Sequence, residues 1–124
     1  MSKNNLKQRM KSGEILIGVS VPINASLNEM EEIISKDEYA FVSTDSQHNA
    51  FNEETLVNFC QHAKKLQIPT QFRIKHTRET YLIGNILDLG PLAIEVPQVE
   101  DIETVKEAVN YFYYPQIIYI WFDY

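Results

Sequence analysis

One stretch of the chain decides how the rest is interpreted: Tyr39-Ala40-Phe41-Val42-Ser43-Thr44-Asp45-Ser46-Gln47-His48. Its first half combines aromatic and β-branched residues, which is typical of a buried strand. Its second half carries Asp, Ser and His, which favour the loop that follows a strand. We therefore expect a strand over residues 39–44 whose carboxyl end presents polar side chains.

The same kind of apolar run recurs along the chain and alternates with segments of helical periodicity. Strands are expected over residues 15–21, 39–44, 70–74 and 93–96. Helices are expected after Ser26, after Asn52, from about Arg78 to Leu89, and after Asp101. This alternation predicts an α/β fold of four βα units with a parallel sheet and right-handed crossovers. The polar residues that end the strands would then meet at one edge of the sheet.

Local signals mark several of the helix ends. Ser26 and Glu29 form a capping-box pattern, and Asn52 precedes a helix with two acidic residues in its first turn. Ser2 can cap a short basic helix that Gly13 stops. Helical spacing also places Leu6 and Met10 on one side of the first helix, and it places Ile102, Val105, Val109 and Phe112 on one side of the last.

Length and composition limit the classes of protein that the chain can represent. The 124 residues are 44% hydrophobic and 23% charged, so we expect a single domain over residues 1–124. The net charge of -6 leaves no basic stripe for nucleic acid or for a membrane surface. A polar amino terminus and the lack of a long apolar run predict a cytoplasmic protein. Cys60 is the single cysteine and is interpreted as a packing residue.

The carboxyl-terminal tail differs in kind from the rest. Residues 111–124 hold eight of the fourteen aromatic residues, and Asp123 is the first charge that follows. The tail would be strand-like, a fifth strand, if it is buried. If it is exposed, its long apolar edge would favour association with another chain, including a homo-oligomer.

Asp45 and His48 are the first candidates for chemistry. A tight loop can bring residues three positions apart together, so that the carboxylate orients the imidazole and raises its basicity. The alternative is a loop aspartate beside a solvated histidine. Gln47 is either a hydrogen-bonding support for substrate or a polar surface residue.

Arg73 ends the strand over 70–74 and is flanked by apolar residues. At the carboxyl edge it would lie one strand away from His48, where its planar fork suits a carboxylate or a developing enolate. The alternative is a surface ion pair. His62 is interpreted as structural or surface, His76 as a helix cap, and Asp101 as a cap rather than a cation ligand. The sequence contains no phosphate loop, dinucleotide fingerprint or serine elbow.

These segments together resemble the amino-terminal half of the HpcH/HpaI aldolase and citrate lyase family, the metal-dependent pyruvate aldolases. The resemblance covers about residues 6–115 and leaves 116–124 as a divergent tail. It is carried by Leu6-Lys7-Gln8-Arg9-Met10-Lys11-Ser12-Gly13-Glu14 with Ile17-Gly18, by Asp45-Ser46-Gln47-His48, by Arg73, by Leu87-Asp88-Leu89-Gly90, and by the stretch from Ile94 to Val99.

The resemblance implies about half of a TIM-type (β/α)8 barrel with its active site at the carboxyl edge. It also implies carbon-carbon lyase activity, the retro-aldol cleavage of a 2-keto-4-hydroxy acid to pyruvate and an aldehyde. Asp45 and His48 would handle the proton of the substrate hydroxyl, and Arg73, with Gln47 nearby, would hold the 2-keto acid. A divalent ion, Mg²⁺ or Mn²⁺, would stabilise the enolate. Asp88 would lie near a subunit contact.

Departures from the family limit the expected activity. The family's metal ligands, a Glu and an Asp on later strands, would fall beyond residue 124, so this sequence offers no metal ligand for either. A barrel has about 250 residues, and an aromatic run replaces the family pattern after Pro115, as in a truncated or frameshifted product. We expect weak or no lyase activity from the chain alone. The alternatives are a non-catalytic interaction or regulatory protein and, less well supported, a receiver-like domain, which would need an acidic pair at Ser20-Val21-Pro22.

Overall fold

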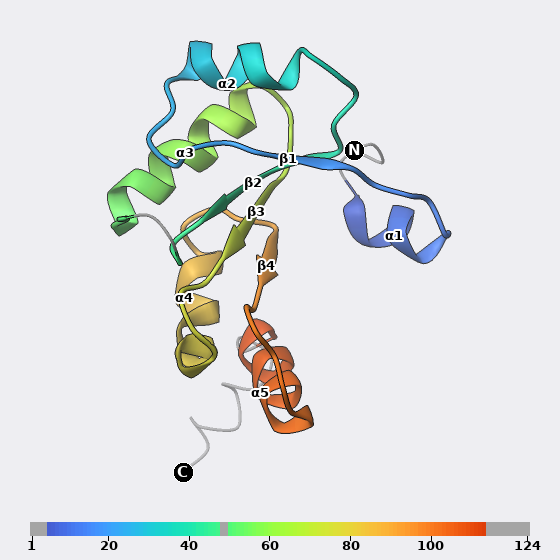
Figure 1. Cartoon of the computed structure of the whole chain (residues 1–124), viewed down its shortest axis with the longest axis vertical. Helices are drawn as coiled ribbons and strands as arrows, with labels where there is room; N and C mark the ends of the chain where they lie inside the picture. Colours follow the sequence, from blue (N-terminus) through green and yellow to red (C-terminus); the bar gives the residue numbers. More distant parts are fainter. Residues whose placement is uncertain (1–4, 48–49, 114–124) are drawn as a thin grey trace, which may run out of the picture.

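The computed structural model describes residues 5–47 and 50–113. Helices and strands alternate along this part of the chain (Figure 1). The strands are β1 (Gly18–Ser20), β2 (Phe41–Asp45), β3 (Thr70–Arg73) and β4 (Ala93–Glu95). The helices are α1 (Leu6–Lys11), α2 (Leu27–Ile34), α3 (Glu53–Lys65), the 3-10 helix η2 (Thr77–Leu82), α4 (Ile83–Leu87) and α5 (Ile102–Phe112).

The four strands form one parallel sheet in the order β1-β2-β3-β4. Each strand therefore lies beside its neighbour in sequence, as expected when every crossover runs through a helix in the same direction. Thr70 pairs with Val42, and the register then brings Asp45 opposite Arg73, and Arg73 opposite Glu95. The predicted βα order and the parallel sheet are confirmed.

The two faces of the sheet have opposite character. Val42 and Phe72 are fully buried and belong to a core that also contains Met30 of α2 and Phe59 of α3. The residues that alternate with them along β2 and β3 are partly exposed. Because successive side chains in a strand point to opposite faces, the helices cover one face and leave the other open. Figure 1 shows α2 and α3 together beside the strands.

The helix caps follow the sequence signals closely. Ser26 and Glu29 form the predicted capping box, and the Asn52 side chain accepts a hydrogen bond from the backbone amide of Thr55. Asp101 caps α5 in the same way through Thr104. Gly13 has the left-handed φ of 87° that a helix stop requires. The first cap is a correction, because α1 begins at Leu6 and Asn5, rather than Ser2, accepts the capping bond.

The predicted helix over about 78–89 is shorter and mixed. A 3-10 turn, η2, precedes a five-residue α4 that ends at Leu87. Its cap is His76, as predicted, whose Nδ1 accepts from the backbone amide of Arg78 at 3.0 Å. Strand β1 is also shorter than predicted, since Ile15 and Ile17 precede it and are exposed. The pattern of apolar residues thus predicted that these elements exist but did not predict their first and last residues.

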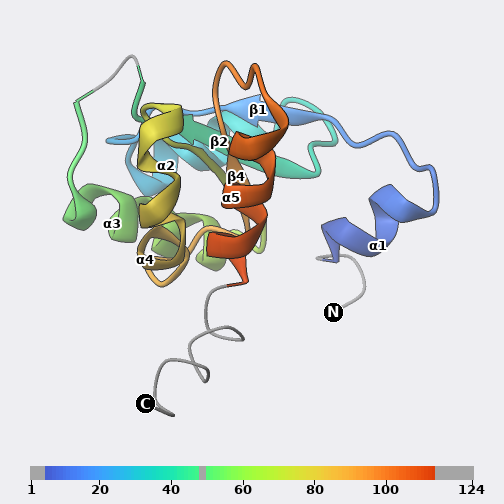
Figure 2. The same cartoon turned by 90° about the horizontal axis from the view of Figure 1, so that it is seen from below.

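Two apolar helix faces are largely exposed in the part of the chain that the structure describes. Helix α1 lies to one side of the sheet in Figure 1, where Lys7 Nζ donates to the Tyr113 hydroxyl at 3.2 Å at the end of α5, and its Met10 is 66% exposed. Figure 2 gives the view from below. On α5, the side chains of Ile102, Val105 and Val109, here called the α5 stripe, are exposed. Phe112, the fourth residue of that face, packs against the core together with Ala108 and Tyr111. The spacing of the apolar residues correctly indicated a helix, but it did not indicate which side of that helix is buried.

Within residues 5–47 and 50–113, every helix is too short or too polar to traverse a lipid bilayer. The predictions for the tail from residue 114 onward concern residues outside the described part of the chain.

Candidate active site at the carboxyl edge

The open face of the sheet is lined by rows of polar side chains. The register places Ser20, Ser43 and Gln71 in one row across β1, β2 and β3. The next row, at the carboxyl edge, consists of Asp45, Arg73 and Glu95. Parallel strands bring their carboxyl ends to one edge, so residues distant in sequence become neighbours there.

Asp45 and Arg73 form the central contact of this edge. Arg73 Nη2 donates to Asp45 Oδ2 at 2.9 Å, and the two side chains are 27% and 21% exposed. Asp45 Oδ1 also accepts from the backbone amide of Gln47. A charge-assisted hydrogen bond in a partly desolvated position is stronger than an exposed one. The Asp45 carboxylate is thus oriented from two sides, by the guanidinium and by its own loop.

Ser46 locks the two strand ends together. Its side chain is 1% exposed, and its Oγ donates to the carbonyl oxygen of Arg73 at 3.0 Å. Its backbone amide donates to the same carbonyl at 3.1 Å. These two hydrogen bonds to one carbonyl oxygen hold the backbone of residue 73 beside that of residue 45. Sequence reasoning did not single out Ser46, because a serine after a strand is also an ordinary loop residue.

Glu95 completes the row and was missed by the sequence analysis. Its Oε2 lies 4.0 Å from Arg73 Nη1, and its Oε1 accepts from Gln71 Nε2 at 3.0 Å. Its position at the end of the fourth predicted strand is a signal that could have identified it, because polar residues that end parallel strands meet at one edge of the sheet. The same argument identified Asp45 and Arg73. In the sequence, however, a carboxylate within an apolar run is equally consistent with a solvent-exposed residue at the end of a strand.

A hollow of about 430 Å³ opens over this edge. It is bounded by the carboxyl ends of all four strands, and its lining consists of Ser20, Val21, Pro22, Ser43, Thr44, Asp45, Arg73 and Glu95. The predicted residues Asp45 and Arg73 both line it. His48, the predicted partner of Asp45, lies outside the described residues, and Gln47 contributes its backbone amide to Asp45. The structure therefore brings together the carboxylate and the guanidinium of the predicted set.

The ligand set at this edge does not suit a divalent cation. Asp45 and Glu95 are its described carboxylates, and a guanidinium lies between them at 2.9 and 4.0 Å. A cation placed there would be repelled by Arg73 and would compete with it for the same oxygens. No group of three or more His, Cys, Asp or Glu side chains with metal-binding geometry occurs in the described ranges. The metal that the family resemblance implies thus has no fitting site among these residues.

The remaining candidates have structural explanations. Burial raises the pKa of the Cys60 thiol to about 11, against a smaller lowering by its hydrogen bond to Thr70, which fits a packing residue. Asp101 is a helix cap, and its hydrogen bonds to Thr104 hold its pKa below the usual value. His62 is partly buried on α3, and its Nδ1 is enclosed with no hydrogen-bond partner in the part of the chain that the structure describes.

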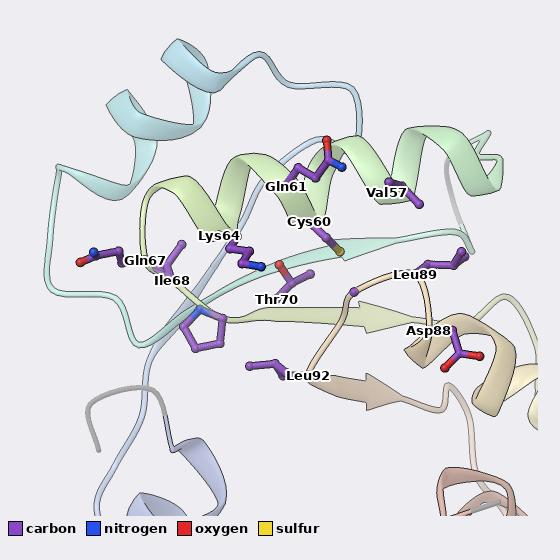
Figure 3. Close-up of a pocket in the computed structure, with 12 residues that line it drawn as sticks. Val57, Cys60, Gln61, Lys64, Gln67, Ile68, Thr70, Asp88, Leu89 and Leu92 are labelled. Carbon is purple, nitrogen blue, oxygen red and sulfur yellow. The ribbon is translucent and has the colours of Figure 1, made fainter. Parts of the chain in front are cut away.

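A second, larger hollow lies at the opposite end of the strands (Figure 3). Its volume is about 590 Å³, and it lies between α3 and the segment from Asp88 to Leu92, near the start of β3. Figure 3 shows the Cys60 sulfur pointing from α3 toward the strands, with Lys64 and Thr70 nearby and Asp88 at the far side. Lys64 and Asp88 both line this hollow, but they form no ion pair in the part of the chain that the structure describes. Asp88 is exposed there, and its predicted subunit contact remains a prediction.

Solved structures similar to this chain are longer enzymes. Citrate synthase SbnG is 34% identical, with a TM-score of 0.73, over 90% of this chain and 44% of its own. A variant of the same synthase matches at 33% identity, a TM-score of 0.69, and 90% and 46% coverage. An HpcH/HpaI aldolase from Desulfitobacterium hafniense DCB-2 matches at 22% identity, a TM-score of 0.71, and 89% and 42% coverage. No protein-family model and no curated protein matches the sequence.

The chain therefore spans about half the length of the solved structures it matches. These matches confirm the half-length resemblance to the HpcH/HpaI aldolase family and the prediction of parallel (β/α) repeats that form about half of a TIM-type barrel. They support a lyase-type fold. The roles of individual residues rest on the geometry described above.

Proposed function

We propose that this chain, which resembles HpcH/HpaI aldolases over about half of their length, provides the acid/base and anion-binding part of a carbon-carbon lyase site. The reaction is the retro-aldol cleavage of a 2-keto-4-hydroxy acid to pyruvate and an aldehyde. The observation that carries the proposal is the Asp45–Arg73 pair, 2.9 Å apart at the carboxyl ends of adjacent parallel strands and open to a hollow. Active sites of (β/α) barrels lie at this edge.

Each residue has a distinct role in the proposed reaction. Arg73 binds the carboxylate or keto oxygen of the substrate and stabilises the negative charge that develops on the enolate. His48, oriented by Asp45, accepts the proton of the C4 hydroxyl as the C3–C4 bond breaks. The pair of electrons from that bond becomes the enolate of pyruvate, which then takes a proton at C3 from the imidazolium of His48, so that the base is restored. Asp45 is suited to orient a base, because its own carboxylate is held on two sides.

Metal dependence belongs to the proposal at the level of the family only. The described carboxylates are engaged by Arg73. Ligands for Mg²⁺ or Mn²⁺ would have to come from outside the described residues, and the proton-handling step above does not use them. The 124-residue chain is accordingly expected to perform the enolate half-reaction better than the full cleavage.

The proposal is tested through that half-reaction. Exchange of the methyl protons of pyruvate in deuterium oxide, followed by proton NMR, reports enolate formation without the aldehyde. We expect exchange above the buffer rate, reduced at least about tenfold in Arg73→Lys and in Asp45→Asn. The first variant loses the guanidinium that binds the enolate oxygen, and the second loses the carboxylate charge that orients the base. Glu103→Gln on the exposed end of α5 serves as the matched control and leaves the rate unchanged. Exchange at the buffer rate in the unaltered chain, with or without added Mn²⁺ or Mg²⁺, would overturn the proposal.

A second candidate, a non-catalytic interaction protein, is favoured by one specific observation. The α5 stripe exposes three apolar side chains on one helix, with Ile102 62% and Val109 50% exposed. Uncovered apolar area of this kind often marks an interaction surface. Sedimentation velocity distinguishes the candidates: a monomer at all concentrations excludes self-association, and a dimer that Val109→Glu dissociates supports it.

A further inference from the structure

Arg73 is contacted by carboxylates at both ends of its guanidinium. Nη2 donates to Asp45 at 2.9 Å, whereas Nη1 lies 4.0 Å from Glu95 Oε2. The first contact is a hydrogen bond and the second is an ion pair that is too long to be one. Glu95 therefore attracts Nη1 by charge but does not accept a hydrogen bond from it.

Gln71 explains why Glu95 approaches no closer. The Gln71 amide donates to Glu95 Oε1 at 3.0 Å from the preceding row of the same open face. The Glu95 side chain is 46% exposed, about twice as much as that of Asp45 at 21%. Glu95 is thus the loosely held member of the row and the one that an entering molecule meets first.

The charges of this row affect what can bind to Arg73. Two carboxylates share one guanidinium, so the row carries an excess negative charge. A carboxylate that enters the hollow to reach Nη1 must approach Glu95 at nearly the same distance, and like charges at this separation repel measurably even near water. The penalty grows with each negative charge that the entering molecule carries.

We propose that Glu95 determines the charge selectivity of the site: it competes with the substrate carboxylate for Arg73 Nη1, admits monoanionic 2-keto acids, and disfavours dianionic ones. This inference rests on the proposed function, because it assumes that Arg73 is the anion-binding group. Glu95 acts on the substrate through charge, and Gln71 positions it.

The test compares three small probes that differ in charge. Pyruvate is a monoanion, oxalate is a dianion, and pyruvamide is neutral. Their dissociation constants are measured by NMR titration of the 124-residue chain and of Glu95→Gln, which removes the charge, keeps the shape, and leaves an amide that can still contact Gln71. We expect Glu95→Gln to bind pyruvate about threefold and oxalate about tenfold more tightly, with pyruvamide unchanged, because each ligand charge loses one screened repulsion.

Glu103→Gln is the matched control, since it removes an equal charge from an exposed position on α5 and should alter no dissociation constant. If the dissociation constants of pyruvate and of oxalate are the same for Glu95→Gln as for the unaltered chain, the inference is overturned while the proposed function stands. Absence of binding by both proteins would overturn the proposed function itself. An equal gain for all three probes would indicate a change of shape rather than of charge and would also overturn the inference.

Discussion

The two ends of the strands hold hollows of similar size but different chemistry. The hollow at the amino end is the larger, about 590 Å³ against about 430 Å³ at the carboxyl end. At the amino end, Lys64 faces a neutral thiol and the Thr70 side chain (Figure 3). At the carboxyl end, the Arg73 guanidinium lies 2.9 Å from the Asp45 carboxylate and 4.0 Å from the Glu95 carboxylate.

This difference shows that the volume of a hollow does not identify which end of the sheet carries the site. The hollow at the amino end is lined in part by core residues, and burial raises the pKa of its cysteine, Cys60. The carboxyl end gathers side chains whose charges are only partly compensated, which is what binding an anion and moving a proton require. Substitutions at the amino end are therefore expected to affect stability, and substitutions at the carboxyl end are expected to affect binding.

The largest effect is expected from Gly90→Ala at the amino end. Gly90 has a φ of 131°, and a Cβ there would lie 2.6 Å from the Cβ of Cys60. Both strain and overlap oppose a side chain, so we expect a loss of about 2–4 kcal/mol in the free energy of unfolding. Urea denaturation measures it, and pyruvate binding under native conditions should persist.

Gly13→Ala is the control for this substitution. Gly13 also has a positive φ, 87°, but a Cβ there would have no atom within 4 Å. Its cost should be about 1 kcal/mol, that of the backbone conformation alone. Equal losses for the two variants would show that contact with Cys60 is unimportant and that the amino end is not tightly closed.

A moderate effect is expected from Ser46→Ala at the carboxyl end. The variant removes the 3.0 Å bond from Ser46 Oγ to the Arg73 carbonyl but keeps the backbone bond to the same oxygen. We expect a loss of about 1 kcal/mol together with weaker pyruvate binding, since the strand ends are less firmly aligned. Ser35→Ala is the matched control, because its Oγ also donates to a backbone carbonyl, that of Glu32 at 2.7 Å, and Ser35 does not line the hollow. Unchanged binding in Ser46→Ala would show that alignment of the strand ends is not limiting.

The smallest effect is a pH dependence from Cys60. Its thiol ionises near 9.0 when unfolded and at about 11 when folded. Between these values the unfolded chain releases the proton and the folded chain retains it, so stability falls as the pH rises through this window. Between pH 8 and 9.5 only the first part of this window is covered, and the fall should be about 1 kcal/mol or less. It is measured as the difference between the unaltered chain and Cys60→Ala in urea denaturation from pH 8 to 9.5, and parallel curves would contradict the raised pKa.

Local signals predicted the parts of the fold that depend on neighbouring residues. The caps at Ser26, Asn52 and Asp101 are present because a side-chain oxygen and an amide two or three residues later suffice to form them. The cap of α1 was assigned to Ser2 instead of Asn5, since both residue types suit the role. The helical period placed the α5 stripe on one side of its helix, and the stripe is exposed, because periodicity shows that one side is apolar without showing which element covers it.

By itself, the sequence determined the βα alternation, the helix caps, and the candidacy of Asp45 and Arg73 at the ends of their strands. Only the tertiary structure decided that Arg73 lies between Asp45 and Glu95, that Gln71 holds Glu95, and that Ser46 joins the two strand ends. The physical reason is register. A shift of one residue between two parallel strands would send one partner to the opposite face of the sheet, and that alignment is set by core packing around Val42 and Phe72, not by any local pattern.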